Sequence, residues 1–458
     1  MKSFVQSDGF KNATRLVTTL YAILFLVNVF VKSNILTWAT AILLLVIYFL
    51  GFCIMNKTNR MVIGVLAILG AVLLVVYKVD VNGWLAAIRK SASTIALIYF
   101  ASILSMPFFY KPYQAELKNV CEKYIPSPTV FLILSGFVAF FLGFYMSMAA
   151  IPVIYALLGD ISKEYKCHRA FLMTICAGNA LIIAAAPSTG AGVALPAYGI
   201  SYTEMLRVGF PLAILLTVIA AIVNATTAKK EGAVNREKNT SIEVKWSNIG
   251  MLVFIFLLLT GLILCIDNFT NINILAGVSL MALPFALIFA VVQGKMDVFK
   301  KRLSGYWDKG MLKNPNTMTI LGIGGFVGEG LKRVGAINSF FEFLASQSSI
   351  ALILPLLIML IAVLTSVIGV HPAAMGATLA AIVKPELLGV TPVCAAMIVL
   401  IGWSISLAVS PFSAVTNLTS AQSGEDIWTF TAGKAVKWAA VCLIVATVLI
   451  DVLVVLGI

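Results

Sequence analysis

Four short segments place polar side chains next to glycine or proline inside long apolar runs, at 143–152, 187–192, 369–376 and 410–417. Proline removes a backbone donor and blocks continuation of a helix, so these segments predict interrupted helices. Lipid cannot satisfy the freed backbone groups, which must therefore face protein or a hydrated cavity. A helix that starts at such a break presents its positive end to an anion, while free carbonyl and hydroxyl oxygens suit Na⁺.

The candidate substrate-binding residues are the polar side chains of these segments, together with an asparagine shortly before the break at Pro187. They are Ser147, Asn179, Ser188, Thr189, His371, Ser413, Thr416 and Asn417. Hydrogen bonding between helices is the alternative role for the hydroxyl and amide side chains. For His371 the two interpretations are a donor or titrating group facing the substrate, and a neutral histidine bonded to a nearby carbonyl.

Groups for other kinds of chemistry are missing from these segments. No aspartate or glutamate lies at any of the four, whereas a proton antiporter normally keeps a carboxylate in mid-membrane. The seven cysteines are scattered and the chain has only two histidines, so no metal centre is expected. The pattern favours Na⁺-coupled movement of an anion by a protein that is not an enzyme and has no cofactor other than Na⁺ as coupling ion.

The composition is that of a polytopic membrane protein. Of the 458 residues, 61% are hydrophobic and 11% are charged, against about 25% charged in a soluble domain. The net charge of +13 lies in short loops between apolar runs, where it sets orientation, so nucleic acid is not an expected partner. The bilayer is the expected environment.

Eleven apolar runs are long enough to cross a membrane as helices. They lie at 13–31, 34–53, 60–78, 94–109, 170–199, 205–227, 248–266, 272–293, 316–331, 389–421 and 428–456. Two further runs, about 129–159 and 349–383, are too long for one crossing and are interrupted midway. We interpret them as re-entrant hairpins. With the N-terminus cytoplasmic and the C-terminus outside, 24 of the 32 basic residues fall on the inner side of a plasma (inner) membrane, as the positive-inside rule requires.

The two halves of the chain share a pattern at a nearly constant offset. Trp84 and Trp307 are 223 residues apart, and Pro187 and Pro411 are 224 apart. We expect an extra N-terminal helix in 1–33, a first repeat in 34–227, a cytoplasmic linker in 228–247 and a second repeat in 248–458. Five spans and one hairpin per repeat require the repeats to be inverted, which is typical of secondary transporters.

In this layout the chain resembles the ion transporter superfamily, most closely the divalent anion:sodium symporters, whose halves each carry a hairpin followed about 40 residues later by an unwound helix. Ser147 and Pro187 are 40 residues apart, and Ala373 and Pro411 are 38 apart. The family's Ser-Asn-Thr tip is replaced by Ser147-Met-Ala and by Pro372-Ala-Ala. The resemblance implies a homodimer with an elevator mechanism. It also implies Na⁺ sites around Ser147, Ser188, Gly190 and Gly192 in one half, and around Ala373, Ser413, Thr416 and Asn417 in the other.

These observations predict an all-α secondary transporter of a small, carboxylate-like organic anion, coupled to Na⁺ and using alternating access. A sodium/proton antiporter on the same fold is the first alternative. An integral-membrane enzyme such as a lipid-linked transferase is the second, although the loops lack a phosphate-cradling glycine motif.

Overall fold

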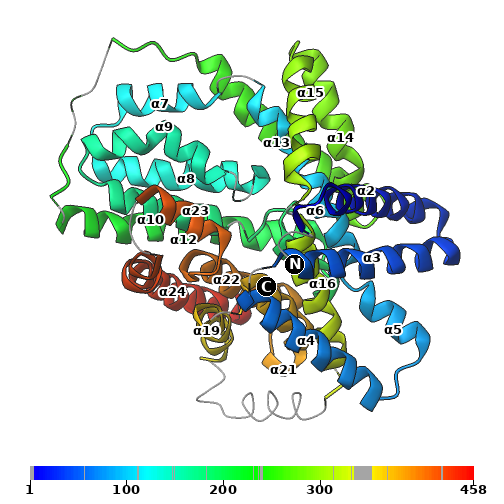
Figure 1. Cartoon of the computed structure of the whole chain (residues 1–458). Helices are drawn as coiled ribbons and strands as arrows, with labels where there is room; N and C mark the ends of the chain where they lie inside the picture. The colour runs from blue at the N-terminus through cyan, green and yellow to red at the C-terminus, as the bar shows by residue number, and fades with distance from the viewer. Residues whose placement is uncertain are drawn as a thin grey trace.

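A computed structural model describes most of the chain (Figure 1). The described residues are 5–55, 57–110, 113–146, 148, 150–181, 183–230, 232–235, 237, 241–312, 314–331, 333–334, 353–368, 370–423 and 427–457. All regular structure in this part of the chain is helical. The predicted all-α class is therefore confirmed.

Ten helices within the described ranges are long and apolar enough to cross a membrane, close to the eleven expected. The count differs for identifiable reasons. The expected span at 170–199 is broken into two short pieces, and the glycine-rich helix at 314–331 is not apolar enough, whereas the first hairpin arm is long enough to be counted. The expected span at 94–109 ends early at Leu104 and continues as a 3₁₀ turn that contains Pro107.

One set of helices, which we call the peripheral group, lies mainly on the right of Figure 1. Its members are α2 (Asp8–Val31), α3 (Asn34–Ile54), α4 (Lys57–Val76), α5 (Val81–Ile88), α6 (Ala92–Leu104), η1 (Met106–Phe109), α13 (Trp246–Phe269), α14 (Ile274–Val292), α15 (Met296–Gly305), the π-helical turn η3 (Tyr306–Gly310) and α16 (Asn314–Leu331). The short helices α5 and α15 were not among the predicted spans, because each has only eight to ten residues.

The second set, the core group, contains the segments singled out in the sequence. Its members are α8 (Pro128–Met146), α9 (Ala150–Glu164), α10 (His168–Ala180), α11 (Thr189–Tyr198), α12 (Tyr202–Lys230), α19 (Leu354–Val367), α20 (Pro372–Ile382), α21 (Pro385–Leu388), α22 (Pro392–Val409), α23 (Ala414–Ser423), the π-helical turn η4 (Thr429–Ala435) and α24 (Val436–Val455). The polar helix α7 (Tyr113–Tyr124) lies beside α9. The four predicted interruptions fall between α8 and α9, α10 and α11, α19 and α20, and α22 and α23.

Within the core group, the same two kinds of helix contact occur in both halves of the chain. The first arm of each hairpin packs on the first piece of the broken helix in its own half, α8 on α10 and α19 on α22. The second piece of each broken helix packs on the other half, α11 on α20 and α22, and α23 on α9 and α10. Such exchange is expected of two related halves that meet at their interrupted helices.

Glycine allows both hairpins to lie close against the broken helices. A Cβ at Gly178 of α10 would lie 2.4 Å from the carbonyl oxygen of Gly136 in α8. A Cβ at Gly402 of α22 would lie 2.9 Å from the Cα of Met359 in α19. Gly178 and Gly402 are 224 residues apart, so the close approach occurs once in each half.

The contact between α16 of the peripheral group and α20 of the core group is made largely by small residues. Gly324 and Gly328 of α16 lie against Ala377 and Ala381 of α20, at distances that would leave no room for a Cβ at either glycine. This small-residue packing brings two membrane helices together without interlocking side chains.

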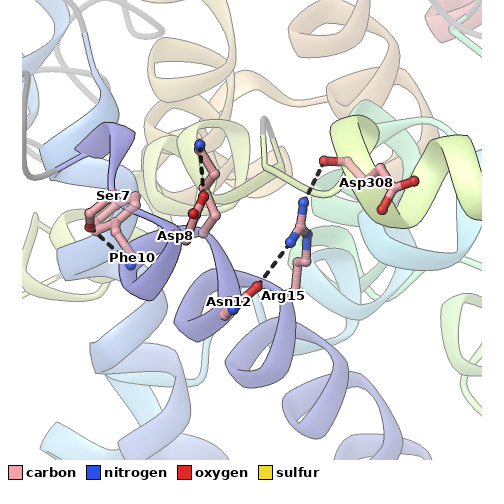
Figure 2. Close-up of polar contacts among 7 residues, drawn as sticks. Ser7, Asp8, Phe10, Asn12, Arg15 and Asp308 are labelled. Atoms are coloured by element: carbon pink, nitrogen blue, oxygen red, sulfur yellow. Dashed lines mark hydrogen bonds and ion pairs between the residues drawn. The ribbon is translucent and has the colours of Figure 1, made fainter.

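The first helix is fastened to the second half of the chain by one arginine (Figure 2). Arg15 of α2 donates to the carbonyl oxygens of Trp307 and Asp308 in η3, at 3.1 and 2.8 Å, and to the Oδ1 of Asn12 at 3.0 Å. Carbonyls near the end of a helical segment carry the negative end of its dipole, so the guanidinium is well placed there.

We predict that Arg15→Met speeds hydrogen exchange in residues 306–311, because the π-helical turn loses two charge-assisted hydrogen bonds. A loss of about 1.4 kcal/mol corresponds to about tenfold faster exchange. Hydrogen-exchange mass spectrometry measures it. Lys11→Met is the matched control, since Lys11 pairs only with the exposed Asp8 at 3.3 Å. Unchanged protection in the Arg15 variant would contradict the fastening role.

Candidate functional site

In the first half, the hairpin lies directly beside the break. A Cβ at Gly143, near the end of α8, would lie 2.6 Å from the Nδ2 of Asn179 at the end of α10. Asn179 is 2% exposed, so its amide fills the space that the glycine leaves. The amide therefore packs directly against the hairpin at the break. Ser147 at the tip lies outside the described residues.

In the second half of the chain, one hydrogen bond from a hydroxyl to a backbone carbonyl joins the hairpin to the broken helix. Ser410, which ends α22, donates from its Oγ to the carbonyl oxygen of Ser366 in α19 at 2.8 Å. The position that matches Asn179 is Trp403, and its indole packs where a Cβ of Gly376 would be, within 2.2 Å. The two halves thus use different side chains for similar contacts between hairpin and broken helix.

At the second break, side chains of the break itself form hydrogen bonds with its backbone carbonyl and N–H groups. Thr416 Oγ1 donates to the carbonyl oxygens of Ser410 and Ser413, and Asn417 Nδ2 donates to those of Pro411 and Ser413 at 3.0 and 2.7 Å. Ser413 Oγ accepts the backbone N–H of Val415 at 3.1 Å. Ser413 and Thr416 are fully buried. These predicted site residues lie together, and their hydrogen bonds hold the shape of the break.

In the described part of the chain, the first break makes fewer hydrogen bonds within itself than the second. Ser188 caps α11 by accepting the N–H of Ala191 at 3.1 Å. Thr189, the first residue of α11, is half-buried, and its hydroxyl makes no hydrogen bond with the described residues. Gly190 faces the other half, where a Cβ would lie 2.9 Å from Leu400 of α22. The Thr189 hydroxyl is therefore available to a bound molecule.

His371 caps the second arm of the second hairpin. Its Nδ1 accepts the N–H of Ala373 at 3.2 Å, at the start of α20. An accepting Nδ1 places the proton of the neutral ring on Nε2, so His371 offers an N–H donor on its other side. The histidine therefore accepts from a backbone N–H, whereas the structural alternative in the sequence had it bonded to a carbonyl.

The helices that start at these two caps run side by side. Residues 192–197 of α11 and 377–381 of α20 line the same small cavity, so their C-terminal portions lie together. Each of these helices begins at a cap, Ser188 before α11 and His371 before α20. The N-terminus of each favours an anion through its free backbone N–H groups and its dipole.

The cavity brings in residues of the peripheral group that were absent from the predicted site. Lys90, Ser91 and Thr94 line it from the start of α6, and Gly325 lines it from α16. Thr94 Oγ1 donates to the carbonyl oxygen of Gly192 at 2.7 Å, joining α6 to α11. Sequence reasoning did not place Thr94 at the site, because a contact across 98 residues leaves no local pattern.

Within the described residues, no group of three or more histidine, cysteine, aspartate or glutamate side chains is placed to hold a metal ion. The polar groups of the tips and breaks are hydroxyls, amides, one imidazole and backbone groups. Such a set can bind and orient an anion or an alkali cation.

No protein-family model and no curated protein matches this sequence. Solved structures do match, and among them is the YdaH transporter of Alcanivorax borkumensis, whose crystal structure is described as having an unusual topology. The TM-score is 0.55 at 15% sequence identity, over 83% of this chain and 90% of that one. The chain is thus a polytopic membrane protein with a transporter-like fold.

We predict that Thr416→Val destabilises the protein by about 1–3 kcal/mol, because the buried carbonyl oxygens of Ser410 and Ser413 each lose one donor. Thr447→Val is the matched control: Thr447 is also buried and bonds only to the carbonyl of Leu443 within the regular helix α24, at 2.8 Å. Unfolding in an SDS titration measures both. Equal losses in the two variants would contradict a special role for the break.

Proposed function

We propose that this protein is a secondary active transporter of a small organic anion, coupled to Na⁺. The observation that carries the proposal is the meeting of two interrupted helices and two hairpins from the two halves of the chain. Interrupted helices at membrane depth suit binding of a solute and its coupling ion, because they present backbone groups that a regular helix uses internally. The likeness to a solved transporter supports the same class of function.

An anionic substrate is supported by the starts of α11 and α20 at the two interruptions. Each start has positive dipole character, and the side chains there add neutral donors, the Thr189 hydroxyl and the Nε2–H of His371. No carboxylate side chain lies at the described tips and breaks to repel an anion. A carboxylate accepts hydrogen bonds from such donors.

Na⁺ is proposed to bind at the breaks through oxygen atoms. The hydroxyl oxygens of Ser188, Ser413 and Thr416 have lone pairs beyond the bonds described above, and carbonyl oxygens accept more than one contact. Around the second break, Na⁺ would share carbonyls that Thr416 and Asn417 already hold in place. Ion binding would then stiffen a loop whose shape is largely set.

Movement is proposed to be of the elevator type, with the core group sliding against the peripheral group. The Gly324 and Gly328 contact with Ala377 and Ala381 supports this, because small side chains leave a smooth surface. The resemblance in layout further supports a homodimer in the inner (plasma) membrane with a cytoplasmic N-terminus, in which the peripheral group stays fixed.

We predict that proteoliposomes containing the protein take up a labelled carboxylate faster with an inward Na⁺ gradient than without one. Thr189→Val should lower the apparent affinity about tenfold, the value of one hydrogen bond to a charged group, without loss of stability. Thr378→Val is the control, since the Thr378 hydroxyl bonds only within α20, to the carbonyl of Ala374 at 3.0 Å.

A sodium/proton antiporter on the same fold is the alternative to this proposal. It is tested in the same vesicles with a pH-sensitive dye inside. A change of internal pH that follows Na⁺ without any carboxylate would replace the symporter by the antiporter. Uptake of a carboxylate that ignores Na⁺ would retain the anion transporter and remove the sodium coupling.

A further inference from the structure

We propose that the cavity beside Lys90 is an anion-binding vestibule, in which the Lys90 ammonium binds the carboxylate of a small monocarboxylic acid. When no acid is bound, the carboxylate of Glu329 pairs with Lys90 instead. The inference rests on the proposed function, since it names the substrate class of the same transporter. The vestibule lies along the C-terminal portions of α11 and α20, away from their N-terminal ends at Thr189 and His371.

The side chain of Lys90 packs on Gly325 of α16, and its ammonium group lies beside Glu329, one helical turn further along. Its Cβ and Cγ lie 3.4 and 3.3 Å from where a Cβ of Gly325 would be. Its Nζ lies 3.5 Å from Oε2 of Glu329, four residues further along the same helix. The side chain therefore lies along one wall of the cavity, and it is only partly exposed, at 34%.

Glu329 has a second cation to which it can turn. Its Oε1 lies 3.9 Å from Nη1 of Arg333, and the same nitrogen donates to the backbone carbonyl of Glu329. The carboxylate is therefore shared between two cations. A substrate carboxylate can replace it at Lys90 while Glu329 stays paired with Arg333, so no charge is left without a partner.

The charge and the walls of the cavity define the ligand. Lys90, Glu329 and Arg333 together carry one net positive charge, which one monovalent anion neutralises. The facing walls are apolar and short, formed by Val193, Pro196, Ala197, Ala377, Ala380 and Ala381. The free space has room for about one or two water-sized groups and is open on one side, so we infer that only the carboxylate enters it, with the short aliphatic tail of an acid such as propionate at its mouth.

The experiment is calorimetric titration of the detergent-purified full-length protein with propionate, succinate and chloride as sodium salts. We expect Lys90→Met to weaken propionate binding about tenfold or more, because a charge-assisted contact is lost. We expect Glu329→Gln to strengthen it about tenfold, because the internal competitor is gone. Lys90→Arg should retain binding, which guards against a simple folding defect.

The opposite signs distinguish this proposal from a purely structural ion pair, whose two variants would both lose affinity or stability. Lys118→Met and Glu122→Gln are the matched controls, since this pair on α7 has a similar separation of 3.8 Å and lies away from the cavity. Neither control should change propionate binding. Chloride or succinate binding as tightly as propionate, or no propionate binding at all, would overturn the ligand assignment.

Uptake into proteoliposomes separates this inference from the proposed function. Propionate uptake that is the same in wild type and Lys90→Met overturns the vestibule and leaves the transporter standing. Binding with the expected opposite signs, but without uptake, supports the vestibule and overturns the transport function.

Discussion

A backbone carbonyl inside a bilayer must find its hydrogen bond within the protein, because hydrocarbon offers none. A regular helix meets this requirement by itself, and an interrupted one does not. At the second break, side chains add to what the backbone supplies: Thr416 and Asn417 donate to the carbonyls of Ser410, Pro411 and Ser413, and those of Ser410 and Ser413 also accept a backbone N–H. Ser410 in turn ties the break to the hairpin through the carbonyl of Ser366. The irregular shape is therefore a stable structure, on which the other contacts of the core group are built.

The same constraint explains the distribution of small residues. Interrupted segments need neighbours close enough to shield and partner them, so each hairpin approaches its broken helix at a glycine, Gly178 or Gly402. The contact of α16 with α20 is also made of glycine and alanine. Elsewhere the two groups meet through polar bonds, such as those from Thr94 to Gly192 and between Tyr145 and Thr260.

Hydropathy predicted the spans and the four interruptions, because runs of about 20 apolar residues and proline within them are local signals. Ser188 and His371, which cap the starts of α11 and α20, were both predicted from the sequence as substrate-binding residues. The cavity was not predicted, since Lys90 and Gly192 lie far apart in the sequence and meet only through the packing of α6 on α11. Short helices such as α5 and α7 were missed because they are too short or too polar to span. The bonding of Thr416 inside its own loop depends on a turn geometry that residue types alone do not specify.

The unequal pair Asn179 and Trp403 has a consequence for how this sequence can change over generations. Each side chain occupies space that a glycine of its own hairpin leaves free, Gly143 for the amide and Gly376 for the indole. A larger residue at either glycine is tolerated only after its partner has become smaller, and a smaller partner first opens a void. Substitutions at these positions are therefore coupled, so that a single exchange at one member of a pair is unfavourable without a matching exchange at the other. Distant homologues should keep each pair together or exchange both members.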